Sequence, residues 1–289
     1  MKKYSLTLKA TIAALIMCGA FVPAIAQIQR NTLINFYGKV VDQNDQPIAG
    51  AAVKLVVAAD PSEDNVPEEK DYALETDQDG KFSLTGAFGR ALQIQSIEKS
   101  GYELSAKAQR GYPYLLAPGI HHPDANAPVL FKMWKRGTSE PLVGASKIYK
   151  VIPDGRPYTI DLLKHEEKPG ISPPGDIIVR INRPEKLVPG KKFDWSYSVE
   201  AIDGGIIHTN SDFLYQAPET GYEPKYEFSA PATNALWFGG VRGEQFYIKS
   251  RGGQVYGRLE VEIITDYDDH AAFKVDSALN PAGSRHLER

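Results

Sequence analysis

Residues 36–55 read FYGKVVDQNDQPIAGAAVKL, and the same kind of pattern returns in ETDQDGKFSL at 75–84 and KSGYEL at 99–104. Ile34, Phe36 and Val40 recur on a two-residue period, which is typical of a half-buried β-strand. The Asn, Asp and Pro of DQNDQP then favour a turn, because Asn and Asp tolerate turn conformations and Pro47 cannot donate to a ladder. These residues predict a small all-β unit.

The rest of this unit is also expected to consist of strands and turns. The acidic segment at 60–71 is too polar for a core and is expected to be a loop, and Gly80 suits the positive φ of a hairpin turn at 77–80. The expected elements are strands at 34–41, 51–58, 72–76, 81–84 and 92–97, with the acidic loop at 60–71.

Three pieces, GKVVD, PIAGAAV and TDQDGKF, occur together in residues 33–105. This segment resembles the carboxypeptidase regulatory-like domain, a small transthyretin-like β-sandwich related in shape to Ig-like folds. The resemblance implies an accessory module used by exported proteins for folding support, spacing or adhesion. It implies no catalytic residues, since that module has none.

The first 26 residues have the pattern of a secretory signal peptide. Lys2, Lys3 and Lys9 precede an apolar run at 10–22, and Ala24-Ile25-Ala26 offers a small-x-small cleavage site. Cleavage after Ala26 predicts export, with the periplasm, the cell surface or the medium as the destination. It also removes Cys18, the one cysteine of the chain, so the mature protein is expected to fold without disulfides.

The length of the chain indicates its number of domains, and its charge narrows the classes of binding partner. The mature chain of 263 residues fits two domains. Without the three signal lysines it has 30 basic and 36 acidic residues, interspersed rather than clustered. Nothing in this pattern predicts nucleic-acid binding, and no second apolar run is long enough to span a membrane.

Residues 106–175 are interrupted by ten prolines and are expected to form a partly extended connector with a few strands. The segment 129–135, VLFKMWK, is the clearest strand. A hairpin is expected to turn at Asp154-Gly155. The sequence PGISPPG at 169–175 marks the expected boundary before the second domain.

Residues 176–275 are expected to form a larger β-sandwich or jelly-roll, followed by a tail at 276–289. Alternation returns at 177–182 and 193–199, and Arg251-Gly252-Gly253 is expected to join two long strands in a hairpin. The second of these, 254–265, is expected at the centre of its sheet, because long exposed edges invite aggregation.

Catalytic patterns are weak. His121-His122 and His165 lack the spacing of a zinc peptidase, and solvated loop residues are the favoured interpretation. Glu260 and Glu262 share a strand face, so a glycoside hydrolase or other hydrolase on the second sandwich is one alternative. The same alternation arises in any amphipathic strand. The sequence therefore predicts a protein that is not an enzyme.

No cofactor is predicted, with Ca²⁺ as the single alternative. Asp266, Asp268 and Asp269 follow a long strand, and three nearby carboxylates repel one another unless water or a cation intervenes. A hydrated turn is the competing interpretation.

Aromatic residues are frequent in the second domain, and such rings stack on sugars or peptide side chains. Trp237 is followed closely by Gly239-Gly240, where a loop could turn the ring outward, and Tyr215 and Tyr222 lie in another loop. These three are the candidate ligand-binding residues of a lectin-like carbohydrate-binding protein. The competing interpretation is that Trp237 closes one end of the sandwich.

Taken together, the sequence predicts an exported, non-enzymatic protein of β-sandwich modules that acts in binding, adhesion or scaffolding in the cell envelope or outside the cell. The expected partner is a polysaccharide or an envelope protein. The oligomeric state stays open.

Overall fold

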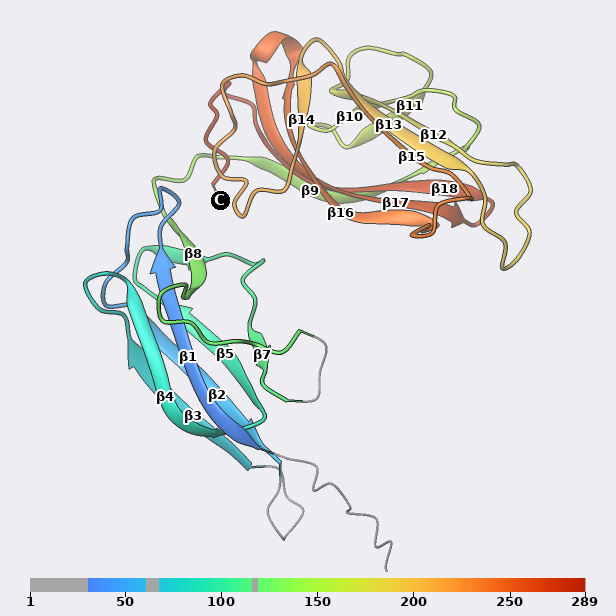
Figure 1. The fold of residues 1–289 in the computed structure, drawn as a ribbon. Coiled ribbons are helices and arrows are strands. Elements are labelled where there is room, and N and C mark those ends of the chain that lie inside the picture. Colours follow the sequence, from blue (N-terminus) through green and yellow to red (C-terminus); the bar gives the residue numbers. More distant parts are fainter. Residues whose placement is uncertain (1–30, 61–67, 116–118, 289) are drawn as a thin grey trace, which may run out of the picture.

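The computed structural model describes residues 31–60, 68–115 and 119–288, which form two β-sandwiches (Figure 1). The expected signal peptide, Cys18 and residues 61–67 of the acidic loop lie outside these ranges. Within them the single helical element is a 3₁₀ turn, Arg251–Gly253. None of the described residues belongs to a helix long and apolar enough to cross a membrane.

Eight strands make the first sandwich, in two four-stranded sheets of order β4-β1-β8-β6 and β3-β2-β5-β7. The strands are β1 Thr32–Val41, β2 Ala52–Ala59, β3 Glu68–Glu75, β4 Lys81–Gly89, β5 Ala91–Glu98, β6 Tyr102–Leu104, β7 Gly111–Pro113 and β8 Val129–Lys135.

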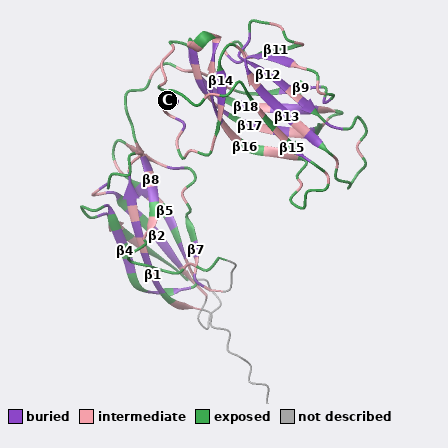
Figure 2. Ribbon diagram, turned by 45° about the horizontal axis from the view of Figure 1, so that its top comes forward, coloured by how far each residue is buried: buried purple, intermediate pink, exposed green. Residues whose placement is uncertain are grey.

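The two-residue period of β1 places Ile34, Phe36 and Val40 fully inside this sandwich, where they meet the inward side chains of the opposite sheet. Buried residues therefore alternate with exposed ones along the strands (Figure 2). Gly38 also faces inward, and the ring of Phe82 fills the space above it. A Cβ on Gly38 would lie 2.3 Å from Cζ of that ring, so the glycine permits the ring to pack.

The turn at 77–80 differs from the expected hairpin. Oδ1 of Asp77 accepts hydrogen bonds from the backbone N–H groups of Asp79 and Lys81, and Gly80 has a φ of +73°. The turn is as predicted, but β3 pairs with β2 and β4 pairs with β1. The turn therefore carries the chain from one sheet to the other.

Ten strands make the second sandwich, in two five-stranded sheets of order β11-β10-β12-β13-β15 and β14-β16-β17-β18-β9. The strands are β9 Val143–Val151, β10 Tyr158–Asp161, β11 Glu166–Pro169, β12 Ile177–Asn182, β13 Trp195–Ala201, β14 Gly205–Thr209, β15 Lys225–Ala230, β16 Gly240–Ser250, β17 Val255–Tyr267 and β18 His270–Asn280.

The expected connector at 106–175 is largely built into the two sandwiches. β7 and β8 belong to the first sandwich, where β8 pairs in parallel with β1. β9, β10 and β11 belong to the second. The expected hairpin at Asp154-Gly155 was wrong, because β9 pairs with β18 while β10 pairs with β11 and β12. The prolines interrupt strands here without preventing them.

Two expectations for the second sandwich are confirmed. β16 and β17 form a hairpin through Arg251–Gly253, and β17 lies at the centre of its sheet between β16 and β18. The expected tail at 276–289 is different: β18 continues to Asn280, and Leu287 is fully buried. The end of the described chain is thus part of the packed structure.

A buried ionic cluster joins the two sheets of the second sandwich. Arg251, in the β16–β17 hairpin, contacts Asp176 through Nε at 2.9 Å and Asp161 through a terminal nitrogen at 2.9 Å. Asp176 is 0% exposed and also accepts from the hydroxyl of Ser250 and the backbone N–H of Leu162. The hydrogen bond from Arg251 to Asp176, together with the charges of Asp176 and Asp161, raises the pKa of Arg251 above its ordinary value. We call these three charged residues the Arg251 cluster.

Replacing Gly38 with Ala is expected to lower the free energy of unfolding by about 1–3 kcal/mol, because the new methyl group overpacks against the ring of Phe82. Chemical denaturation of the purified protein measures this change. Gly111→Ala is the matched control: a Cβ there meets no atom within 4 Å, so its effect should stay within about 0.5 kcal/mol. Equal stability of both variants would contradict the packing argument.

Arg251→Met is expected to cost about 3–5 kcal/mol in the free energy of unfolding, because it leaves two buried carboxylates without their cation. Chemical denaturation of the purified protein at neutral pH measures this loss. Arg242→Met is the control, since the side chain of Arg242 is 84% exposed in its pair with Glu262 and such pairs contribute about 0–1 kcal/mol. Equal losses for Arg251→Met and Arg242→Met would argue against the assigned role of the Arg251 cluster.

Candidate functional site at the junction of the two sandwiches

The ring of Trp237 packs against the second sandwich, as in the end-closing interpretation, and does not take the outward position that a ligand-binding role needs. Its indole N–H donates to the backbone carbonyl of Phe193 at 2.7 Å, and its ring meets the Phe193 ring edge-on at a centroid distance of 5.0 Å. The ring is half-buried against the core of the second sandwich. Its neighbours Leu236 and Phe238 are instead 77% and 68% exposed. The end-closing interpretation therefore describes Trp237.

Tyr222 is also occupied within the sandwich. Its hydroxyl donates to the carbonyl of Pro218 at 3.2 Å, its ring packs edge-on to Tyr256, and burial raises its pKa. Tyr222 contacts Gly205, opposite Lys249 near one end of β16, whereas Trp237 lies just before Gly240 at the other end. At about 3.3 Å per residue these points are roughly 30 Å apart. Trp237 and Tyr222 do not form one site.

The three aspartates expected as a calcium site lie at the β17–β18 hairpin. Tyr267 pairs with His270, and Asp268 and Asp269 occupy the two turn positions with φ of 49° and 65°. Such two-residue turns need positive φ at both positions, which Asp tolerates. Asp268 pairs with Lys150 at 3.1 Å. Nowhere in the described ranges do three or more His, Cys, Asp or Glu side chains converge as a metal site would require.

Glu260 and Glu262 share the outer face of β17, as expected, but their surroundings differ. Glu262 is held by Arg242 at 2.8 Å and Lys274 at 3.1 Å. Glu260 lies directly across from Asp276 on β18. The carboxylate that Glu260 faces is therefore on the neighbouring strand and not two residues away on its own strand.

His121 was expected in a solvated loop, and the structure corrects this. Its ring is half-buried among Phe36, Tyr112 and Tyr114, at centroid distances of 5.3, 5.1 and 5.5 Å. Burial lowers the pKa of His121, and the charge of His122 adds to the effect. His121 is thus a neutral packing residue of the first sandwich.

Among the three residues predicted to bind a ligand, Tyr215 is the one that contacts the first sandwich. Its ring meets Trp134 of β8 edge-on at 5.4 Å, and its hydroxyl donates to Glu103 of the first sandwich at 2.7 Å. The guanidinium of Arg258 lies 5.0 Å from the Tyr215 ring centroid. Burial, aided by the bond to Glu103, raises the pKa of Tyr215 to about 12. Tyr215 therefore joins the two sandwiches.

Glu288 is the central acceptor of this contact and is 8% exposed. Its carboxylate accepts from Nε1 of Trp134 at 3.2 Å and from the backbone N–H of Gly137 at 3.0 and 3.2 Å. The preceding Leu287 is buried with Leu214, Ala217 and Tyr247. The end of the described chain thus packs on the second sandwich and bonds to the first, and its dark red trace lies between them (Figure 1).

Lys107 makes a second group of bonds across the same contact. Its Nζ donates to Oδ1 of Asn210, the carbonyl of Ser211 and Oε1 of Gln245, each at 2.8 Å. The buried Ser105 donates to Asp212 at 3.0 Å. We call all of these contacts, between 103–137 on one side and 210–215, Gln245 and Glu288 on the other, the junction.

A groove of about 250 Å³ opens beside the junction. Ala106 of the first sandwich lines one side, and Tyr215, Arg258, Glu260 and Asp276 of the second line the other. Glu260 and Asp276 make no ion pair with any described residue. Like charges directly opposite one another on neighbouring strands are destabilising, so this pair costs the sheet some stability.

Sequence reasoning missed the junction apart from Tyr215. Glu288, Lys107 and Trp134 are separated by up to 181 positions, and no local period marks residues that meet only after both sandwiches have formed. One signal was available. An isolated Trp in the strand VLFKMWK at 129–135 alternates away from the core side chains Phe131 and Met133, which suggests a second contact surface.

Comparisons with known proteins leave the family open. No protein-family model and no curated protein matches this chain, so the carboxypeptidase regulatory-like resemblance of 33–105 stays a prediction. A solved mutant of the shaft pilin spaA from Lactobacillus rhamnosus GG is similar with 10% identity and a TM-score of 0.26, over 70% of this chain and 95% of the pilin. A streptococcal ancillary pilin is similar with 12% identity and a TM-score of 0.24, over 85% of this chain and 59% of the pilin. At such low scores neither likeness bears on what this chain does.

Glu288→Ala is expected to lower the free energy of unfolding by about 1–3 kcal/mol, because the indole N–H of Trp134 and the backbone N–H of Gly137 lose their acceptor. Denaturant titration followed by tryptophan fluorescence measures the loss. Glu219→Ala is the control: Glu219 pairs with Arg285 from a side chain that is 75% exposed, and its removal should cost at most about 1 kcal/mol. A larger loss for the control would contradict the assigned role of Glu288.

Proposed function

We propose that this chain is an exported, non-enzymatic scaffold module that holds two β-sandwiches in one fixed orientation and presents their surfaces to partners in the cell envelope or outside the cell. The observation that carries the proposal is the junction, where aromatic packing, the buried carboxylate of Glu288 and a lysine with three acceptors act together. A flexible tether between independent domains would need none of these bonds.

The polarity of the junction supports a fixed orientation in particular. Lys107 and Glu288 satisfy named partners at 2.8–3.2 Å, and those partners are available in one relative placement of the sandwiches. Buried or half-buried polar groups lose stability when their partners move away. The junction therefore favours one angle between the two sandwiches. Apolar contact alone would restrict that angle less.

The opposite end of the second sandwich supports a contact role. The connection from the first sandwich enters β9 at Val143, opposite Leu279, while Gly240, Ile264 and Ala272 mark the far end of the sheet. There, the exposed Leu236 and Phe238 flank Trp237, which is bonded to Phe193. The carbonyl of Phe238 also accepts from the indole of Trp195 at 2.8 Å. A loop held this firmly presents two apolar side chains at low entropic cost.

Small-angle X-ray scattering of the intact chain tests the scaffold proposal. The wild-type curve should fit a single arrangement of the two sandwiches. The double variant Trp134→Ala/Glu288→Ala should give a larger radius of gyration and require several arrangements, while circular dichroism stays that of a folded β protein. Glu219→Ala serves as the control and should scatter as the wild type. A wild-type curve that itself requires many arrangements would overturn the proposal.

A further inference from the structure

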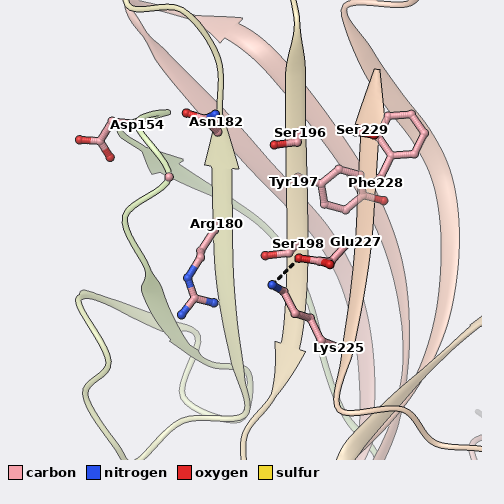
Figure 3. A pocket seen from close by; sticks show the side chains of 11 residues that line it. Asp154, Arg180, Asn182, Ser196, Tyr197, Ser198, Lys225, Glu227, Phe228 and Ser229 are labelled. Carbon is pink, nitrogen blue, oxygen red and sulfur yellow. Dashed lines mark ion pairs between the residues drawn. The ribbon is translucent and has the colours of Figure 1, made fainter. Parts of the chain in front are cut away.

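A polar trough runs along the outer face of the sheet β11-β10-β12-β13-β15, away from the core of the second sandwich (Figure 3). Its volume is about 520 Å³, within the roughly 300–1,000 Å³ of ligand sites. Its lining comes from β12, β13, β15 and the turn at Asp154-Gly155.

The shape of the trough follows from the register of three strands. In one row across the sheet, Ser198 of β13 lies between Arg180 of β12 and Glu227 of β15. In the next row, Ser196 lies between Asn182 and Ser229. The central strand thus carries short side chains while most of its neighbours carry longer ones. A floor of hydroxyls between higher walls results, as the labelled side chains of Figure 3 show.

Ser198 is the most informative residue of this floor. It is 6% exposed, and its hydroxyl has no hydrogen-bond partner among residues 31–60, 68–115 and 119–288. This hydroxyl is not one of the fully enclosed side-chain atoms that lack a partner, so water or a ligand in the trough can reach it. The hydroxyls of Ser196 and Ser229 and the amide of Asn182 on the same face likewise bond to no side chain or backbone group described. The floor offers a row of open donors and acceptors.

The walls of the trough are electrically balanced. Arg180 pairs with Glu200 at 2.9 Å, Lys225 pairs with Glu227, and Asp154 is held by Arg156. Every charge at the trough therefore has an opposite charge beside it. A phosphate or a nucleic acid, which binds by unpaired cations, finds no such group here.

The remaining chemistry favours hydroxyl groups as ligands. Serine hydroxyls and the asparagine amide each donate and accept, as sugar hydroxyls do. The backbone of β13 is paired on both sides, by β12 and β15, so an extended peptide cannot add to it as a strand. The trough is partly open to solvent rather than enclosed, so a ligand longer than the trough can extend beyond it.

We propose that this trough is a binding site for a neutral, polyhydroxylated glycan chain, recognised by hydrogen bonds from Ser196, Ser198, Ser229 and Asn182. The site goes beyond the scaffold role and is independent of the junction. It is also distinct from the Trp237, Tyr215 and Tyr222 positions expected from the sequence. Because the floor has no exposed aromatic platform, each single contact is weak, and affinity depends on several residues along the chain.

Titration of the ¹⁵N-labelled intact chain with neutral linear hexasaccharides of glucose, xylose, mannose and N-acetylglucosamine tests this proposal by amide chemical-shift changes. At least one sugar at millimolar concentration should shift amides of β12, β13 and β15. Ser198→Ala should weaken that binding roughly 2- to 10-fold, the usual effect of one lost hydrogen bond. Ser196→Leu fills the trough and should weaken it more than tenfold.

Ser146→Leu is the matched control, since Ser146 is an exposed serine on β9 in the opposite sheet, and it should bind as the wild type does. All variants are checked for folding by their amide spectra, and Ser229→Leu, at an exposed position, replaces any that fail. The proposal is overturned by three results: no shifts with any of the four sugars, shifts confined to other surfaces, or undiminished binding by Ser196→Leu. Tighter, salt-sensitive binding of an oligogalacturonate would likewise overturn the assignment of a neutral ligand.

Discussion

Arg251 and the two aspartates it neutralises are the constraint on which the second sandwich depends. The guanidinium lies at the tip of the β16–β17 hairpin, while Asp161 and Asp176 belong to the opposite sheet. Removing charges from water is costly, and three of the four carboxylate oxygens offset this cost by also accepting from backbone or hydroxyl donors. It consequently fixes how the two sheets face each other. The same three residues hold the sheet that carries the trough, β11-β10-β12-β13-β15, in a fixed position relative to the sheet beside the junction, β14-β16-β17-β18-β9.

The cores of the two sandwiches and the contact between the sandwiches are thus stabilised by different kinds of interaction. Inside each sandwich, apolar side chains on a two-residue period supply most of the stabilisation, without any disulfide among the described residues. Between the sandwiches, the contact is polar and aromatic, built on Trp134, Tyr215 and Glu288. Non-directional burial suffices to form a core, whereas hydrogen bonds with defined partners are needed to set an angle.

How far the sequence predicted this molecule depends on the range of the interaction concerned. The length of the strand expected at 254–265 predicted a central position, because a long exposed edge invites aggregation, and β17 has that position. The turns at Asp77–Gly80 and Asp154-Gly155 were also foreseen. Which sheet each following strand would join was not, because Asp and Gly specify a change of direction and not a partner. Trp237 turned inward because a carbonyl 44 positions away accepts its N–H. The trough left no signal at all, since serines within a strand resemble any solvent-facing residues until the neighbouring strands supply the walls.

The position of Leu287 and Glu288 in the chain has a consequence for the order of assembly. Both residues follow every strand of both sandwiches, yet Glu288 bonds directly to the first one through Trp134 and Gly137. A chain made and delivered from its N-terminus can complete the first core early, because domains generally fold as units in that order. The bonds that Glu288 contributes to the junction can form only after residues 287 and 288 have been synthesised. Before that point the two sandwiches can already meet through Lys107 and Tyr215, and the bonds of Glu288 are the last of these contacts to form.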